Sequence, residues 1–200
     1  MEQKEIMKNT LKNTLFNELQ FYNIQYCYLC DLREIWQDIE SFREITAKAK
    51  TFFSVSLCAI KDDYFLTLSR LYDKTNNANT KSIPNLIIKF QKNLHLFDND
   101  PSINDMLNQF NQKINNDSII SIAIKGIRKK RDSILAHTDK EYFGNKIFKE
   151  SIDIQLNLEH LSVLQEFTKQ VIDYLYSIFE VNSSKSKSIL PYYKHDLKNL

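Results

Sequence analysis

Glycine and proline are almost absent from this chain, and their absence constrains the fold more than any other feature. Only 2 Gly and 3 Pro occur in 200 residues, and the first 83 residues contain neither. Tight β-hairpin turns depend on Gly or Asn-Gly pairs, whereas the interior of a long helix excludes both Gly and Pro. The chain is therefore predicted to be all-α.

Apolar side chains recur every three or four residues along most of the chain, as they do on the buried face of a helix. The N-terminal pattern predicts either one long helix or two helices that meet near Tyr28–Asp31. The next helix is predicted to start with a cap at Thr51 and to end near Leu71. Its apolar face is broadened by residues such as Phe52 and Val55, which predicts packing on several sides.

Shorter helices are predicted in the second half of the chain. Their expected starts are Ser82-Ile-Pro84, Pro101-Ser102 and Asn157, because Ser, Asn and Pro favour the first turn of a helix. The first of these helices is predicted to end near Leu96. The alternating segment Ser151–Leu156 stands alone and is interpreted as an extended entry to the last helix.

The composition is that of one folded domain. With 42% hydrophobic and 26% charged residues the chain is not predicted to be disordered, and a formal net charge of +2 is too small to indicate nucleic-acid binding by itself. The charged N-terminus shows no signal peptide, and no apolar run approaches the ~20 residues of a membrane helix. We expect a cytoplasmic protein with one helical domain over residues 1–182 and a polar, basic tail over 183–200.

The cysteines do not predict a metal or redox site. The chain has three cysteines, and an odd number without a secretion signal favours reduced thiols. Cys27 and Cys30 have the spacing of a C-x-x-C motif, but they lie in a helical stripe and no second pair completes a zinc site. Neither a metal nor a cofactor is expected.

The ionisable stretch Arg128-Lys-Lys-Arg131-Asp132-Ser-Ile-Leu-Ala-His137-Thr-Asp139 is the strongest candidate for chemistry. Arg131 is a permanent cation that can hold a phosphate with two parallel N–H bonds. His137 titrates near neutral pH and can accept and return a proton. A fixed charge and an acid–base group suit metal-free cleavage of a phosphodiester. The alternative is a solvated helix end, where basic residues interact favourably with the helix dipole.

The spacing of Arg131 and His137 sets a geometric condition. Six positions rotate a side chain by about 600° along a straight α-helix, which leaves the two residues some 120° apart around the axis. Either the helix ends before His137, or two chains meet so that both copies line one cleft.

These residues resemble a known superfamily. Arg131-Asp132 followed by His137 is similar to the R-x(4–6)-H signature of the HEPN superfamily. The segments Leu135-Ala-His-Thr-Asp139 and Leu68-Ser-Arg-Leu-Tyr-Asp73 resemble its abortive-infection U-type subgroup. The resemblance implies an antiparallel four-helix bundle core with additional N-terminal and short connecting helices. It also implies a homodimer with two Arg and two His around the scissile phosphate.

The function implied by the resemblance is that of a metal-independent endoribonuclease in phage defence or in a toxin–antitoxin system. His137 would remove the proton of a ribose 2′-OH, and Arg131 would stabilise charge on the phosphate. RNA is then the substrate, and an antitoxin protein is an implied partner. In HEPN toxins paired with nucleotidyltransferase antitoxins, a modified Tyr lies two residues after the His. Here that position is Asp139, and Tyr142 lies further on, which departs from the pattern.

Neighbouring charged residues have predicted supporting roles. Orienting carboxylates are one interpretation of Asp132 and Asp139, and helix-surface or turn roles are the other. An ion pair between Arg70 and Asp73 at a helix end explains that pair as well as a site does. Cations predicted to lie on the surface and to contact RNA phosphates are Lys125, Arg128 and Lys129.

Two other functions remain open from the sequence. The first is a non-catalytic HEPN-like helical module that binds nucleotide, RNA or a partner protein through the same basic cluster. The second is a structural helical protein whose dimer is itself the product. Fold alone does not distinguish these functions from catalysis.

Overall fold

The computed structural model describes residues 2–41, 49–73, 80–116, 119–136 and 158–180, and these residues contain helices and no strand. The all-α prediction is confirmed. Within this part of the chain no helix is both long and apolar enough to cross a membrane. The elements are α1 (Glu2–Ser41), α3 (Lys50–Leu71), α4 (Ile83–Lys92), the 3₁₀ helix η1 (Leu94–Phe97), α5 (Pro101–Asn115), α6 (Ile119–Ala136) and α8 (Leu158–Ser177).

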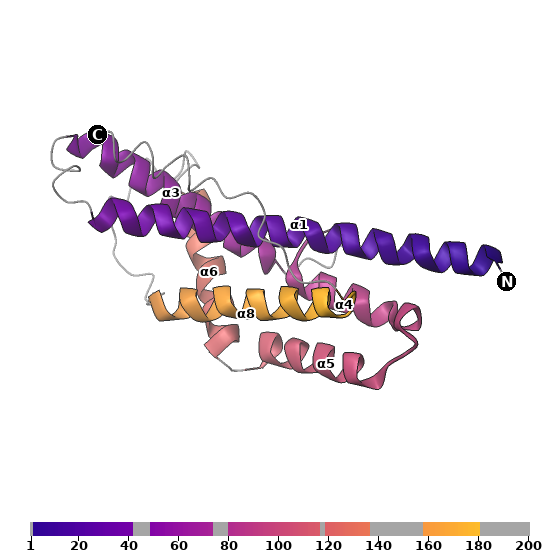
Figure 1. The fold of residues 1–200 in the computed structure, drawn as a ribbon. Coiled ribbons are helices and arrows are strands. Elements are labelled where there is room, and N and C mark those ends of the chain that lie inside the picture. Colours follow the sequence, from indigo (N-terminus) through magenta and orange to yellow (C-terminus); the bar gives the residue numbers. More distant parts are fainter. Residues whose placement is uncertain (1, 42–48, 74–79, 117–118, 137–157, 181–200) are drawn as a thin grey trace.

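The first helix, α1, is continuous over 40 residues. The predicted boundary near Tyr28–Asp31 is wrong, and the alternative of a single N-terminal helix is correct. Its apolar stripe becomes buried at Leu15, whereas Ile6 and Met7 are 60% and 63% exposed. These first turns extend beyond the other described helices, and none of those helices covers their apolar side chains (Figure 1).

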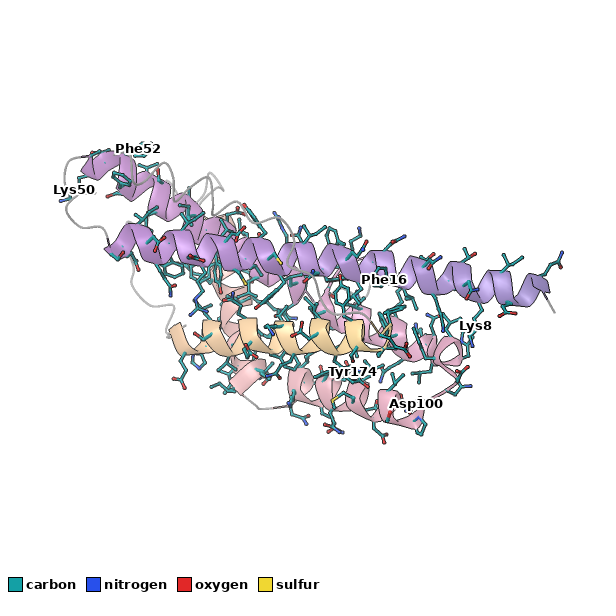
Figure 2. The ribbon with its side chains drawn as sticks, in the orientation of Figure 1. Lys8, Phe16, Lys50, Phe52, Asp100 and Tyr174 are labelled. Carbon is teal, nitrogen blue, oxygen red and sulfur yellow. The ribbon has the colours of Figure 1, made fainter. Side chains whose placement is uncertain are left out.

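The contact between α1 and α8 is partly aromatic. Phe16 of α1 lies in the space between the two helices (Figure 2). Its ring meets Tyr176 and Phe179 edge-on, with centroid distances of 5.7 and 5.2 Å. Edge-to-face pairs add to the energy of apolar burial, which explains how α8 is fixed along α1.

The helix α3 is buried only in its second half. It begins at Lys50 after an N-cap residue, Ala49, that makes no side-chain cap, so the predicted cap at Thr51 is wrong. Phe52 and Val55 are 67% and 65% exposed, and the predicted packing on several sides does not occur there. The reason is that the first turns of α3 reach past the helices that cover its C-terminal half (Figure 1).

The helix starts in the middle of the chain match the prediction better than the helix ends do. Ser82 is the N-cap position of α4 and α5 begins at Pro101, although the Ser82 hydroxyl makes no capping bond. Asp100 caps α5 by accepting a hydrogen bond from a main-chain N–H. The helix α4 stops at Lys92, before the predicted end near Leu96, because the chain tightens into η1.

Several predictions fall on residues outside the described part of the chain. They are the extended segment Ser151–Leu156, the cap at Asn157 and the tail over 183–200. The division of the chain after residue 182 stays a prediction.

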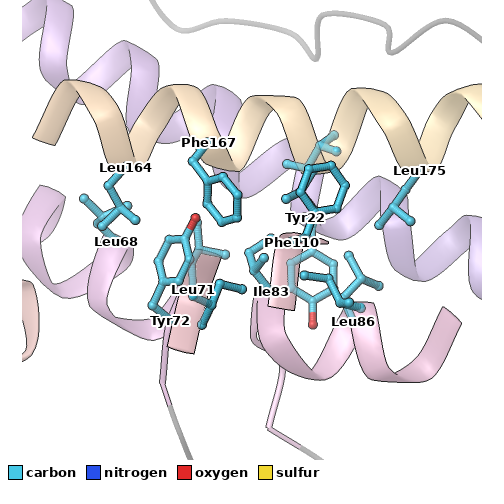
Figure 3. Close-up of a cluster of buried hydrophobic side chains, with 14 of the residues drawn as sticks. Tyr22, Leu68, Leu71, Tyr72, Ile83, Leu86, Phe110, Leu164, Phe167 and Leu175 are labelled. Carbon is cyan, nitrogen blue, oxygen red and sulfur yellow. The ribbon is translucent and has the colours of Figure 1, made fainter. Parts of the chain in front are cut away.

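The core joins the end of α3 to α4, α5 and α8. Figure 3 shows the Tyr72 ring beside Leu71 and below Phe167 of α8, with its hydroxyl directed toward that helix. The residue is fully buried. The segment that follows α3 is therefore anchored in the core, and this anchor determines the position of Asp73, the next residue.

Candidate functional site

The candidate site forms where the C-terminal end of α3 meets α6. Tyr72 and Asp73 directly follow the last residue of α3, and α6 packs against that helix. Arg128 bonds to Tyr72 across 56 positions of sequence, and Arg131 bonds to Asp73 across 58. Because residues three apart share one side of a helix, one face of α6 presents both cations to the end of α3.

Arg131 is held between two carboxylates. Its Nη1 lies 3.2 Å from Asp73 Oδ1, and its Nε and Nη2 each lie 2.9 Å from Asp132 Oδ1. A guanidinium has five N–H donors, and these contacts use at most three of them. The side chain is 23% exposed, so a ligand from solvent can reach part of it.

The carboxylates also preserve the charge of Arg131. Burial by itself would lower the pKa of the guanidinium, but the hydrogen bonds to Asp132 and Asp73 outweigh burial and raise it. Arginine is cationic at neutral pH even without such help. Arg131 therefore offers a fixed positive charge in a defined orientation.

Arg128 is less exposed than the sequence predicted, because it is bonded to the end of α3. Its Nη2 donates to the main-chain carbonyl oxygen of Tyr72, the C-cap residue of α3. Carbonyls at a helix C-terminus lack intrahelical donors, and a cation there also interacts favourably with the helix dipole. Burial lowers the pKa of Arg128, and its Nε is buried with no hydrogen-bond partner in the described part of the chain. The predicted surface position of Arg128 is wrong, whereas its contact with RNA stays a prediction.

The side chain of Tyr72 is hydrogen-bonded to α8, which helps to hold the carbonyl of the same residue in place. Its hydroxyl lies 2.7 Å from Thr168 Oγ1 of α8, and the Thr168 hydroxyl donates to the carbonyl of Leu164 at 2.8 Å. A hydroxyl has one hydrogen, so Tyr72 must be the donor in the first bond. Burial is the main cause that raises the pKa of Tyr72, which keeps this donor protonated.

A groove of about 320 Å³ opens beside Asp73. Its walls come from α1, from α3 and from the segment before α4. Arg70 and Lys81 bring two exposed cations to it, and the Lys81 ammonium lies 4.2 Å from the centroid of the Phe21 ring. Asp73 lines the groove and also pairs with Arg131, so the groove and the arginine site are adjacent.

The family model HEPN_AbiU2, described as AbiU2, matches residues 8–200. This protein belongs to the AbiU2 family. It is accordingly a HEPN protein of the abortive-infection U type, as the motif resemblance indicated. No curated protein and no solved structure matches the chain.

In this AbiU2-family protein the two motif stretches meet in space. Asp73, from the first stretch, pairs directly with Arg131 from the second, and Asp132 contacts the same guanidinium. Arg70 is exposed on the groove, and within the described residues no ion pair joins it to Asp73. The alternative of a purely local pair at the end of α3 is therefore not what forms.

The other predicted site residues divide into two groups. Lys125 and Lys129 are exposed on α6, as expected for phosphate contacts. His137 and Asp139 lie outside the described residues, as does Tyr142, so the distance between Arg131 and the catalytic His candidate stays a prediction.

Sequence reasoning missed two parts of the AbiU2-family site. The carbonyl oxygen of Tyr72 accepts a hydrogen bond from Arg128, and Lys81 lines the groove from the segment before α4. Tyr72 belongs to the quoted motif, but no sequence signal shows that its backbone is used. Among the described residues no group of three or more His, Cys, Asp or Glu could hold a metal ion.

Proposed function

We propose that this AbiU2-family protein is a metal-independent endoribonuclease of an abortive-infection or toxin–antitoxin type. The observation that supports the proposal most is the ion pair of Asp73 with Arg131. It joins both motif stretches and orients a permanent cation whose side chain is partly exposed. A cytoplasmic location and an antitoxin protein that restrains the activity belong to the same proposal.

In the proposed mechanism Arg131 contacts non-bridging oxygens of the scissile phosphate and stabilises the charge that develops there. His137 takes the proton of the ribose 2′-OH as that oxygen attacks phosphorus. The bond from phosphorus to the 5′ oxygen then breaks, and the leaving oxygen receives a proton. The products are a 2′,3′-cyclic phosphate and a 5′-OH. DNA is not a substrate, because it lacks the 2′-OH.

We further propose that a homodimer completes the site. The described part of α6 is helical from Ile119 to Ala136, and six positions on a straight helix turn the side chains of Arg131 and His137 about 120° apart. A two-fold axis beside this helix would bring both copies of each residue to one phosphate. Mixing Arg131→Ala chains with His137→Ala chains should then give more cleavage than either variant alone. A strictly monomeric protein in light scattering would contradict the dimer.

Cleavage of single-stranded RNA in EDTA tests the enzyme proposal. The wild type should cleave, and His137→Ala should lose roughly 10²–10⁴-fold in rate, the usual contribution of acid–base catalysis. His95→Ala is the matched control, because His95 is an exposed histidine in η1. Unchanged cleavage by His137→Ala would assign the activity to a contaminating nuclease or to a different site.

A non-catalytic module that binds nucleotide, RNA or a partner protein is the second candidate. The observation in its favour is that both carboxylates at Arg131 neutralise part of its charge. This candidate predicts RNA binding by the wild type without any cleavage in the same assay. Appearance of a 5′-OH product that requires His137 would exclude it.

A further inference from the structure

The groove beside Asp73 has the size and chemistry of a nucleotide subsite. Its volume of about 320 Å³ falls within the range of small-ligand pockets, roughly 300–1,000 Å³. Two cations, Arg70 and Lys81, reach it from different elements. A groove with paired cations and a partly apolar wall matches a phosphate attached to a flat ring better than it matches an apolar ligand.

We propose that this groove binds one nucleotide of the RNA strand, adjacent to the phosphate that Arg131 contacts. The inference rests on the proposed function, because it takes RNA as the ligand at Arg131. It adds a subsite formed by α1, by α3 and by the segment before α4, and none of these elements carries Arg131.

The cations are arranged to receive the phosphate of this nucleotide. Arg70 is exposed at the last turn of α3, and no ion pair with another described residue engages its guanidinium. Lys81 is held at the groove by the face of Phe21, 4.2 Å from the ring centroid. A cation–π contact positions the ammonium without using a hydrogen-bond acceptor, which leaves its three donors for phosphate oxygens.

The inner wall offers polar groups for a base or ribose. Gln25 is half-buried, and its amide supplies both donors and an acceptor, as the edge of a base requires. Thr67 is buried, and its hydroxyl lies 3.3 Å from Asp63 Oδ1, which fixes its orientation. Both residues line the groove.

Asp73 connects the subsite to the arginine site. A lone carboxylate in the groove would repel an anionic strand, but Arg131 lies 3.2 Å away and compensates its charge. An RNA strand whose phosphate lies at Arg131 can therefore pass Asp73 and continue between Arg70 and Lys81.

Binding of a mixed-sequence, single-stranded 2′-O-methyl RNA tests the subsite without cleavage. Arg70→Gln/Lys81→Gln should bind it about tenfold or more weakly than wild type, as loss of charge-assisted hydrogen bonds predicts. The slope of affinity against salt should flatten by ~0.7, the value for one phosphate contact on a single strand. Lys50→Gln/Lys92→Gln removes the same charge from exposed positions that do not line the groove, and it should bind like wild type.

The outcomes separate this inference from the enzyme proposal. Equal losses in the two double variants would overturn the subsite, because charge alone would then explain the effect. Adenosine monophosphate that binds as tightly as the RNA, with the same loss in Arg70→Gln/Lys81→Gln, would overturn it in favour of a free-nucleotide site. If wild type does not cleave RNA but the groove variant loses binding selectively, the enzyme proposal fails and the subsite stands. If wild type cleaves and the groove variant binds normally, only the subsite fails.

Discussion

Asp73 Oδ1 lies 3.2 Å from Arg131 Nη1, and this ion pair connects the end of α3 to α6. One turn earlier on α6, Arg128 contacts the carbonyl of Tyr72, the residue before Asp73. The two bonds tie one short stretch of backbone to one face of α6. The orientation of Arg131 therefore depends on how α3 ends.

Asp73→Asn tests whether this carboxylate orients Arg131. The variant removes the ion pair but keeps the size of the side chain, so cleavage at saturating RNA should fall by roughly tenfold to 100-fold, as misplacement of a catalytic group predicts. Asp105→Asn, at an exposed carboxylate of α5, is the control and should cleave at the wild-type rate. Faster cleavage by Asp73→Asn would mean that the carboxylate masks Arg131 instead of orienting it.

Arg128→Glu tests the structural position of Arg128. A carboxylate there faces the carbonyl of Tyr72 and lies near Asp73, and it cannot donate the hydrogen bond that the guanidinium makes. The free energy of unfolding in urea should fall by about 2 kcal/mol or more. Lys129→Glu, one position further on the exposed face, should change it by less than about 0.5 kcal/mol. Equal stability of the two variants would contradict the assignment.

Lys125 and Lys129 give the cleaner test of phosphate binding on α6, because both are exposed. The double variant Lys125→Glu/Lys129→Glu should bind single-stranded RNA more weakly, and its salt slope should flatten by roughly 0.7 for each phosphate that the protein no longer neutralises. Lys50→Glu/Lys92→Glu reverses two exposed charges elsewhere on the described surface. If this control weakens binding equally, the face of α6 has no special role.

Ionisation of the buried Tyr64 hydroxyl should make the free energy of unfolding depend on pH in the alkaline range. Burial raises the pKa of Tyr64 to about 12 from its ordinary value near 10. Between these values the hydroxyl is ionised in the unfolded chain and neutral in the folded protein, so its contribution to stability is complete below pH 10 and is lost as the pH rises toward 12. Tyr64→Phe should therefore show a shallower fall of the unfolding free energy over this interval, by up to ~1.4 kcal/mol per pH unit. Parallel curves for the variant and wild type would exclude this role.

Much of the helical pattern could be predicted because its causes are local. The scarcity of Gly and Pro predicted an all-α fold, and Pro101 marked the start of α5. The predictions of burial failed where a helix extends beyond its neighbours. Phe52 and Val55 have the spacing of core residues, but they are exposed on the first turns of α3, which reach past the described helices that cover its C-terminal half.

The sequence predicted which charged residues belong to the candidate site, but it did not predict which of them are buried or what they contact. Lys125, Arg128 and Lys129 have similar chemistry and share one side of a helix, so their sequence positions alone predict similar exposure. In the structure Arg128 is half-buried against the end of α3 while both lysines are exposed. Packing of α6 on α3 creates this difference.

The sequence by itself determined the helical class, the charge of the Arg128–Asp132 cluster and the motif stretches that indicated the family. These properties depend on residues within a few turns of one another. Only the tertiary structure decided that Asp73 pairs with Arg131, that Arg128 caps α3, and that Lys81 joins Arg70 at a groove. The physical reason is that a salt bridge or cap between distant segments forms only where buried apolar faces bring those segments together. Many charged residues of the chain could form such a contact, and the packing of the helices decides which of them do.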